Sequence, residues 1–112
     1  MKKYIQNLNK AFESRVRLGI MSALMVNDSL DFNALKELLE VTDGNLASHT
    51  RALESLKYID VEKSFVGRKP NTKFSITAKG KKAFEQHLSA LEQLLQNTGG
   101  LQPPENKRKS DN

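Results

Sequence analysis

The chain has 112 residues, a formal net charge of +5 and no cysteine. This length suits one small domain, and the lack of cysteine excludes disulfide bonds within the chain and thiolate metal sites. No apolar run approaches the roughly 20 residues of a membrane span, and no apolar segment of a signal peptide follows the basic N-terminus. We therefore expect a cytoplasmic protein without membrane attachment. The positive charge favours a polyanionic partner.

Two helices are predicted in the first quarter of the chain. Apolar residues recur at helical spacing, first from Tyr4 to Phe12 and again from Val16 to Leu24. Ser14 between them is a good N-cap. We predict a leading helix over residues 3–11 and a main helix over residues 14–25. The apolar segment 30–32 is too short for an independent strand and is predicted to add an edge to a small sheet.

Two short amphipathic helices joined by a tight turn are predicted next. Asp31 or Asn33 can cap the first helix, which ends around Glu40. Thr42 or Asp43 can cap the second. The predicted inward stripe of this second helix consists of Leu46, Thr50, Leu53 and Leu56.

A β-hairpin is predicted after these helices. Residues 58–65 alternate with period two, which places Ile59, Val61 and Phe65 on the inward face. Residues 66–71 contain Gly67 and Pro70 and are predicted to form a loop. Residues 72–76 alternate again, with Phe74 and Ile76 inward.

A long last helix is predicted over residues 78–96, with Thr77 as its N-cap. Its apolar stripe is made of Phe84, Leu88, Leu91, Leu94 and Leu95, and a polar, glycine-containing segment ends it. Residues 97–112 have little to bury and are predicted to be a disordered polar tail. Residues 1–96 then form one domain. Lys107, Arg108 and Lys109 in the tail are interpreted as solvated, with non-specific phosphate affinity as the alternative.

This order of elements describes a mainly α fold with a small β-hairpin wing: a winged helix-turn-helix with a long C-terminal helix. An α-helix fits the major groove of B-DNA, where residues near its N-terminal end reach base edges. The outward face of the helix after Thr42 presents four polar candidates, namely Asn45, Ser48, His49 and Arg51. Asn45 suits adenine, Arg51 a guanine or a phosphate, and the other two bases or phosphates. The alternative is an ordinary solvated helix face.

The hairpin supplies a second group of candidate DNA contacts. Arg68 and Lys69 lie at its tip, with Lys63 and Lys73 on the flanking strands. Cations on a protruding loop can meet phosphates or enter a minor groove. A lone basic pair is more often a solubilising turn, but its position directly after a candidate recognition helix favours DNA contact.

No catalytic, metal or cofactor site is predicted. His49 and His87 are the only histidines and lie far apart in sequence, with neither cysteine nor an acidic cluster beside them. No nucleophile is paired with a base, and no glycine-rich phosphate loop precedes a helix. We therefore expect a protein that is not an enzyme.

The terminal helices carry more large apolar residues than a small domain readily covers. These residues can pack within one subunit or across a two-fold axis. We predict the second, because a two-fold axis places two recognition helices about one DNA turn apart. The predicted homodimer interface consists of Ile5, Leu8, Phe12, Phe84, Leu88, Leu91 and Leu95.

The segments SRVRLGIMSAL and LDFNALKELLEVTDGNLASHTRALESLKYIDVEKSFVGRKPNTKFSITAKGKKAF resemble the MarR-like winged-helix transcriptional regulators, in particular their compact subgroup with a single winged helix. The similarity spans about residues 8–95. It implies a dimer that binds DNA sequence-specifically, with the four recognition-helix residues in the groove and Arg68 and Lys69 on the backbone. Full-length relatives often hold a ligand between dimerisation and DNA-binding lobes. This chain is shorter at both ends, so the resemblance leaves a small-molecule effector open.

The sequence thus predicts a transcriptional regulator that binds double-stranded DNA sequence-specifically as a homodimer. The alternative is a winged-helix protein–protein interaction module without specific DNA binding, because Asp43 and Glu54 reduce the positive charge of the recognition helix.

Overall fold

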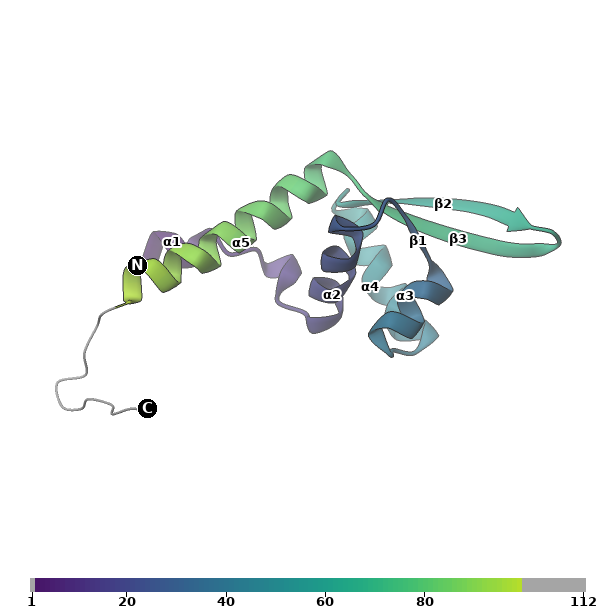
Figure 1. Cartoon of the computed structure of the whole chain (residues 1–112), viewed down its shortest axis with the longest axis horizontal. Coiled ribbons are helices and arrows are strands. Elements are labelled where there is room, and N and C mark those ends of the chain that lie inside the picture. Colours follow the sequence, from purple (N-terminus) through teal and green to yellow (C-terminus); the bar gives the residue numbers. More distant parts are fainter. Residues whose placement is uncertain (1, 100–112) are drawn as a thin grey trace.

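A computed structural model describes residues 2–99 of the chain. Three helices form the body: α2 (Arg15–Met25), α3 (Phe32–Leu39) and α4 (Asp43–Ser55). The hairpin of β2 (Ile59–Val66) and β3 (Lys69–Ile76) extends from one side of this body, and α5 (Ala78–Thr98) extends from the other (Figure 1). The remaining elements are α1 (Lys2–Gln6), a short 3-10 helix η1 (Lys10–Phe12) and β1 (Leu30–Asp31). The predicted winged helix-turn-helix with a long C-terminal helix is confirmed.

Side-chain caps begin the helices at the residues that local sequence indicates. Ser14, Asp31, Thr42 and Thr77 each accept a hydrogen bond from a backbone N–H in the first turn of the helix that follows. Each cap satisfies one of the four N–H groups that a helix start leaves without a partner, which is worth about 1 kcal/mol. Of the alternatives that sequence left open, Asp31 rather than Asn33 caps α3, and Thr42 rather than Asp43 caps α4.

The sheet has the antiparallel order β1-β3-β2, and β3 is its central strand. Leu30 pairs with Phe74, so the apolar segment before α3 is an edge strand, as predicted. The core lies where this sheet meets α2, α3 and α4. Its most completely buried members are Ile20, Met21, Leu24, Leu35, Leu46, Leu53 and Ile59.

Several sequence predictions differ from the structure. The leading helix is broken after Gln6, because Asn9 adopts an extended backbone and caps η1 instead. Leu56 and Phe65 were expected inward but are 41% and 71% exposed, since α4 ends before Leu56 and the hairpin has left the body by Phe65. Residues 66–71 are not a long loop: β2 and β3 stay paired up to a two-residue turn at Gly67 and Arg68.

Gly67 makes that turn possible. Its φ of +66° lies in the left-handed region, and Val66 pairs with Lys69 on either side of the turn. Glycine at the first central position is typical of the tight hairpin turns that match strand twist. Helix α5 also differs slightly, since it continues to Thr98 rather than ending near Gln96. Residues 97 and 98 of the predicted tail therefore belong to α5. Residues 100–112, which hold the rest of that tail with Lys107 to Lys109, lie outside the described residues.

A hydrogen-bonded junction joins the N-terminal segment to α5 and to the body. The backbone N–H of Asn9 donates to His87 Nδ1 over 3.0 Å, and Asn9 Nδ2 donates to the Tyr58 hydroxyl over 3.0 Å. Phe12 packs edge-on against Phe84 and against His87, with ring centroids 5.2 and 5.3 Å apart. These contacts hold the N-terminal half of α5 against the winged-helix body.

We expect this junction to weaken in mild acid. Burial lowers the pKa of His87 from 6.5, although Glu13 opposes the shift, and Nδ1 must stay unprotonated to accept the Asn9 N–H. Because the folded-state pKa is depressed, the stabilisation is complete above about pH 6.5 and is lost as pH falls through the folded pKa. Chemical denaturation between pH 7.5 and 5 should show a falling free energy of unfolding. His87→Gln, which retains an acceptor without titrating, should flatten that dependence, and an unchanged slope would contradict it.

Candidate nucleic-acid interface

The outward face of α4 carries three of the four predicted recognition residues. Asn45, Ser48 and Arg51 are exposed, whereas Leu46, Thr50 and Leu53 on the opposite face are buried. Thr50 retains a satisfied hydroxyl, which donates to the Ala47 carbonyl over 3.1 Å. Since the buried stripe anchors α4 to the body, the polar face is free to meet a ligand along the length of the helix.

His49 lies on the flank of α4 and is only half-exposed. Burial, and after it the positive charge of Arg17 on α2, lowers the pKa of the His49 imidazole below 6.5. The uncharged form of His49 is therefore favoured. It can exchange hydrogen bonds with a base or a phosphate, but it adds no positive charge to the interface.

The other flank of α4 faces the wing. An open groove of about 240 Å³ lies between them, lined by α4 residues including Arg51 and Glu54 and by wing residues including Val61 and Lys63. This groove brings the recognition helix and the wing into one continuous surface. Sequence reasoning placed Arg51 and Lys63 in separate groups, and the structure brings them together.

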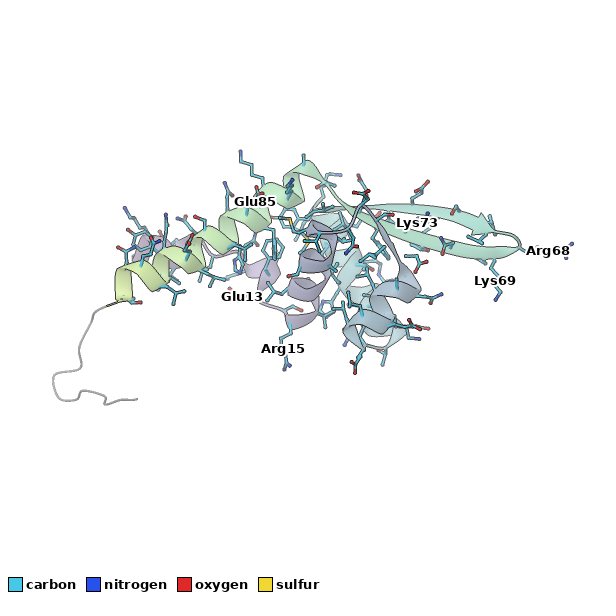
Figure 2. All side chains as sticks on the ribbon, viewed as in Figure 1. Glu13, Arg15, Arg68, Lys69, Lys73 and Glu85 are labelled. Atoms are coloured by element: carbon cyan, nitrogen blue, oxygen red, sulfur yellow. The ribbon has the colours of Figure 1, made fainter. Side chains whose placement is uncertain are left out.

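The wing cations are all exposed. Arg68 lies at the end of the hairpin, and Lys69 and Lys73 follow it on β3 (Figure 2). Lys73 pairs across the strands with Glu62, whereas Lys63 pairs with Thr72, so Lys73 has an opposite charge as its cross-strand neighbour and Lys63 does not. The turn and the outer half of the wing are therefore the most cationic part of the hairpin.

An ion pair reduces the acidic character at the start of α4. Lys36 Nζ of α3 lies 2.7 Å from Asp43 Oδ1, and both side chains are largely exposed. Such an exposed pair contributes little to stability. The positive charge of Lys36 does, however, offset the negative charge of Asp43, the one acidic side chain in the first turn of α4. Lys36 was not among the predicted site residues, and only the spatial approach of α3 to Asp43 reveals its role.

The predicted dimer residues differ in exposure and fall into three groups. Phe12 and Phe84 are 2% and 3% exposed within one chain and belong to its core, so they are not available to a partner. Leu8 is half-buried. Ile5, Leu88, Leu91 and Leu95 remain exposed at 55%, 45%, 41% and 74%, and the three leucines form one open apolar face of α5.

Residues 16–95 match the family described as winged helix DNA-binding domain. The chain belongs to this family. A relative, the uncharacterized protein MJ0432 of Methanocaldococcus jannaschii, is 38% identical over 88 residues, which cover 79% of this chain and 96% of the relative.

Solved structures share this winged-helix fold. The transcriptional regulator homologue protein from Pyrococcus horikoshii OT3 superposes with a TM-score of 0.79 at 29% identity, covering 88% of this chain and 99% of that one. MarR superposes with a TM-score of 0.66 at 17% identity, covering 82% and 69% of the two chains, which shows a shared fold. The resemblance to MarR-like regulators is thus confirmed. The family is that of the winged helix DNA-binding domain, and the fold is shared with solved transcriptional regulators.

Two other kinds of feature, a membrane-spanning helix and a metal site, are not found within residues 2–99. No helix in that range combines the length and apolar character that a membrane crossing requires. Within the same range, no three histidine or acidic side chains gather in a way that could hold a metal ion.

Proposed function

We propose that this winged-helix protein is a homodimeric transcriptional regulator that binds a pseudo-palindromic duplex site, with α4 in the major groove and the wing on the flanking backbone. The observation that carries the proposal is the continuous surface of α4 and the wing, in which Arg51 and Lys63 line one groove. A helix seated in the major groove then brings the hairpin against the adjacent phosphates without any rearrangement of the fold.

The roles of the α4 side chains follow from their chemistry. Asn45 in the first turn suits the paired donor and acceptor of adenine, and Arg51 suits guanine or a phosphate. Ser48 and uncharged His49 are suited to hydrogen bonds with bases or phosphates. The three cations near the hairpin turn, Lys63, Arg68 and Lys69, supply sequence-independent affinity, and Lys73 adds to it from the neighbouring strand position.

The homodimer is proposed on the exposed face of α5. Leu88, Leu91 and Leu95 follow the alternating three- and four-residue spacing of a helix–helix seam. They remain exposed although the opposite side of α5 packs against α1. A second copy of the same face would cover them, with Ile5 at its edge, and the resulting two-fold axis would place two copies of α4 on one face of the duplex.

Selection of bound fragments from a random duplex library tests the proposal. We expect a symmetric motif with two half-sites about one helical turn apart. Affinity for a selected site should fall by orders of magnitude between about 50 and 200 mM salt, as counterions return to the phosphates. Recovery of no enriched sequence, together with no binding at low salt, would overturn the proposed function.

Paired variants separate the two parts of the surface. Arg68→Ala with Lys69→Ala should weaken binding to all sequences and reduce the salt slope by roughly one unit per lost phosphate contact. Arg51→Ala should also reduce sequence preference. At a guanine contacted by Arg51, the free-energy difference between the preferred base and the others should fall by about 1–3 kcal/mol. Lys81→Ala with Lys82→Ala, which removes the same charge from α5, is the control and should change affinity far less.

A further inference from the structure

The outer end of the wing carries an aromatic side chain that the fold does not use. Phe65 is 71% exposed, although its position in the strand alternation matches that of buried Ile59. Its cross-strand partner, Pro70, is also exposed. A single exposed apolar side chain is common. Here an exposed phenylalanine and an exposed proline are cross-strand partners at the end of a projecting hairpin.

The two faces of the hairpin differ in character. On the face toward the body and α4, the cross-strand pairs are Val61 with Phe74, Lys63 with Thr72, and Phe65 with Pro70. On the other face the pairs are Glu62 with Lys73 and Ser64 with Asn71. The α4-side face therefore carries one apolar pair at the core, Val61 with Phe74, and a second at the turn, Phe65 with Pro70. Lys63 and Thr72 lie between them, beside the groove shared with Arg51.

Positive charge dominates around the outer pair. Glu54 of α4 lines the groove, but the hairpin from Lys63 to Lys73 carries no negative side chain. Residues 63–73 contain the cations Lys63, Arg68, Lys69 and Lys73. Arg68 projects beyond the turn (Figure 2). The surface thus combines a small apolar ridge with a cationic rim, and its ligand must combine an apolar interior with a polyanionic edge.

The minor groove of duplex DNA has this combination. Its walls are deoxyribose C–H groups, its edges are phosphates, and it is about 6 Å wide. Phenylalanine and proline are among the side chains that proteins insert between base steps from this groove, with local unstacking and kinking of the duplex.

We propose that Phe65, supported by Pro70, inserts into the minor groove beside each half-site and partly unstacks a base step there. This inference rests on the proposed function, since α4 in the major groove determines where the wing meets the duplex. Pyrimidine–purine steps are the easiest to unstack. The wing therefore favours such a step at a fixed distance from the half-site, at a position that α4 does not contact.

Three substitutions on the full chain test the insertion. Phe65→Ala should lower affinity for a selected site about tenfold and leave the slope of affinity against salt unchanged, because no phosphate contact is lost. Phe65→Leu retains a wedge and should preserve most of the affinity. Val66→Ala is the matched control, since Val66 is 66% exposed but points to the opposite face of the strand, and it should bind like the parent protein.

A fluorescent base gives a direct readout. With 2-aminopurine placed at the step next to the half-site, the parent protein should raise the fluorescence through unstacking, and Phe65→Ala should not. The inference is overturned if the parent binds but Phe65→Ala matches it in both affinity and fluorescence. It is also overturned if Phe65→Ala only reduces binding to phosphatidylserine vesicles, which would identify a lipid surface as the ligand. Failure of the parent protein to bind any DNA would instead overturn the proposed function.

Discussion

Gly80→Ala is expected to destabilise the fold by about 3 kcal/mol or more, at the upper end of the range for overpacking. A Cβ atom at residue 80 would meet the Tyr58 carbonyl oxygen and would lie 2.8 Å from its carbonyl carbon and 2.9 Å from its Cα. These are backbone atoms, which cannot rotate away. The clash would push the first turn of α5 off the start of β2. Thermal unfolding by circular dichroism should show a loss of roughly 15 °C.

Gly44→Ala is the matched control for that variant. Gly44 lies in the first turn of α4, and a Cβ atom there would have no neighbour within 4 Å. Because alanine is a better helix former than glycine, the variant should be as stable as the parent protein or more stable, by up to about 1 kcal/mol. Equal stability of Gly80→Ala and Gly44→Ala would contradict the close approach of α5 to Tyr58.

Leu88→Glu combined with Leu91→Glu is expected to abolish the proposed dimer. Both leucines are on the exposed face of α5, where Glu85 and Glu92 are already neighbours, so the double variant adds like charges across a two-fold axis. A monomer engages one half-site at a time and loses the advantage of linked binding, which is about 100-fold or more. Sedimentation velocity should show the loss of half the mass, and affinity for a two-half-site duplex should fall accordingly.

Val26→Glu is the control for the charge itself, because Val26 is 80% exposed and lies at the end of α2 rather than on α5. It should leave both the mass and the affinity unchanged. A parent protein that is monomeric at the concentrations where it binds DNA would contradict the proposed dimer, and α5 would then have another partner.

Sequence predicted the elements whose signals are local. The caps at Ser14 and Thr77 were recognisable because a short polar side chain that precedes a helical apolar pattern satisfies the first-turn N–H groups. The apolar stripe of α4 and the strand alternation predicted Leu46, Leu53, Ile59 and Phe74 as core residues, and all four are buried. The exposure of Asn45, Ser48 and Arg51 followed from the same periodicity.

Sequence failed where the extent of an element depends on what surrounds it. Phe65 fits the strand alternation, but the body ends before β2 does, so nothing covers it. Pro70 suggested a loop, yet proline is tolerated in β3 at the outer end of the hairpin, where its cross-strand partner is Phe65. The break before η1 depends on Asn9, whose side chain and backbone reach Tyr58 and His87, 49 and 78 residues away.

The sequence by itself determined the order of helices and strands, the polar face of α4 and the family, because capping, periodicity and motif spacing act over a few residues. Only the tertiary structure decided which apolar residues stay exposed and can contact other molecules. Phe12 and Phe84 join the core, whereas Leu88, Leu91, Leu95 and Phe65 do not, although all have the same apolar character. A side chain is buried only where another part of the chain covers it. The positions of α5 and the wing relative to the body decide where that happens.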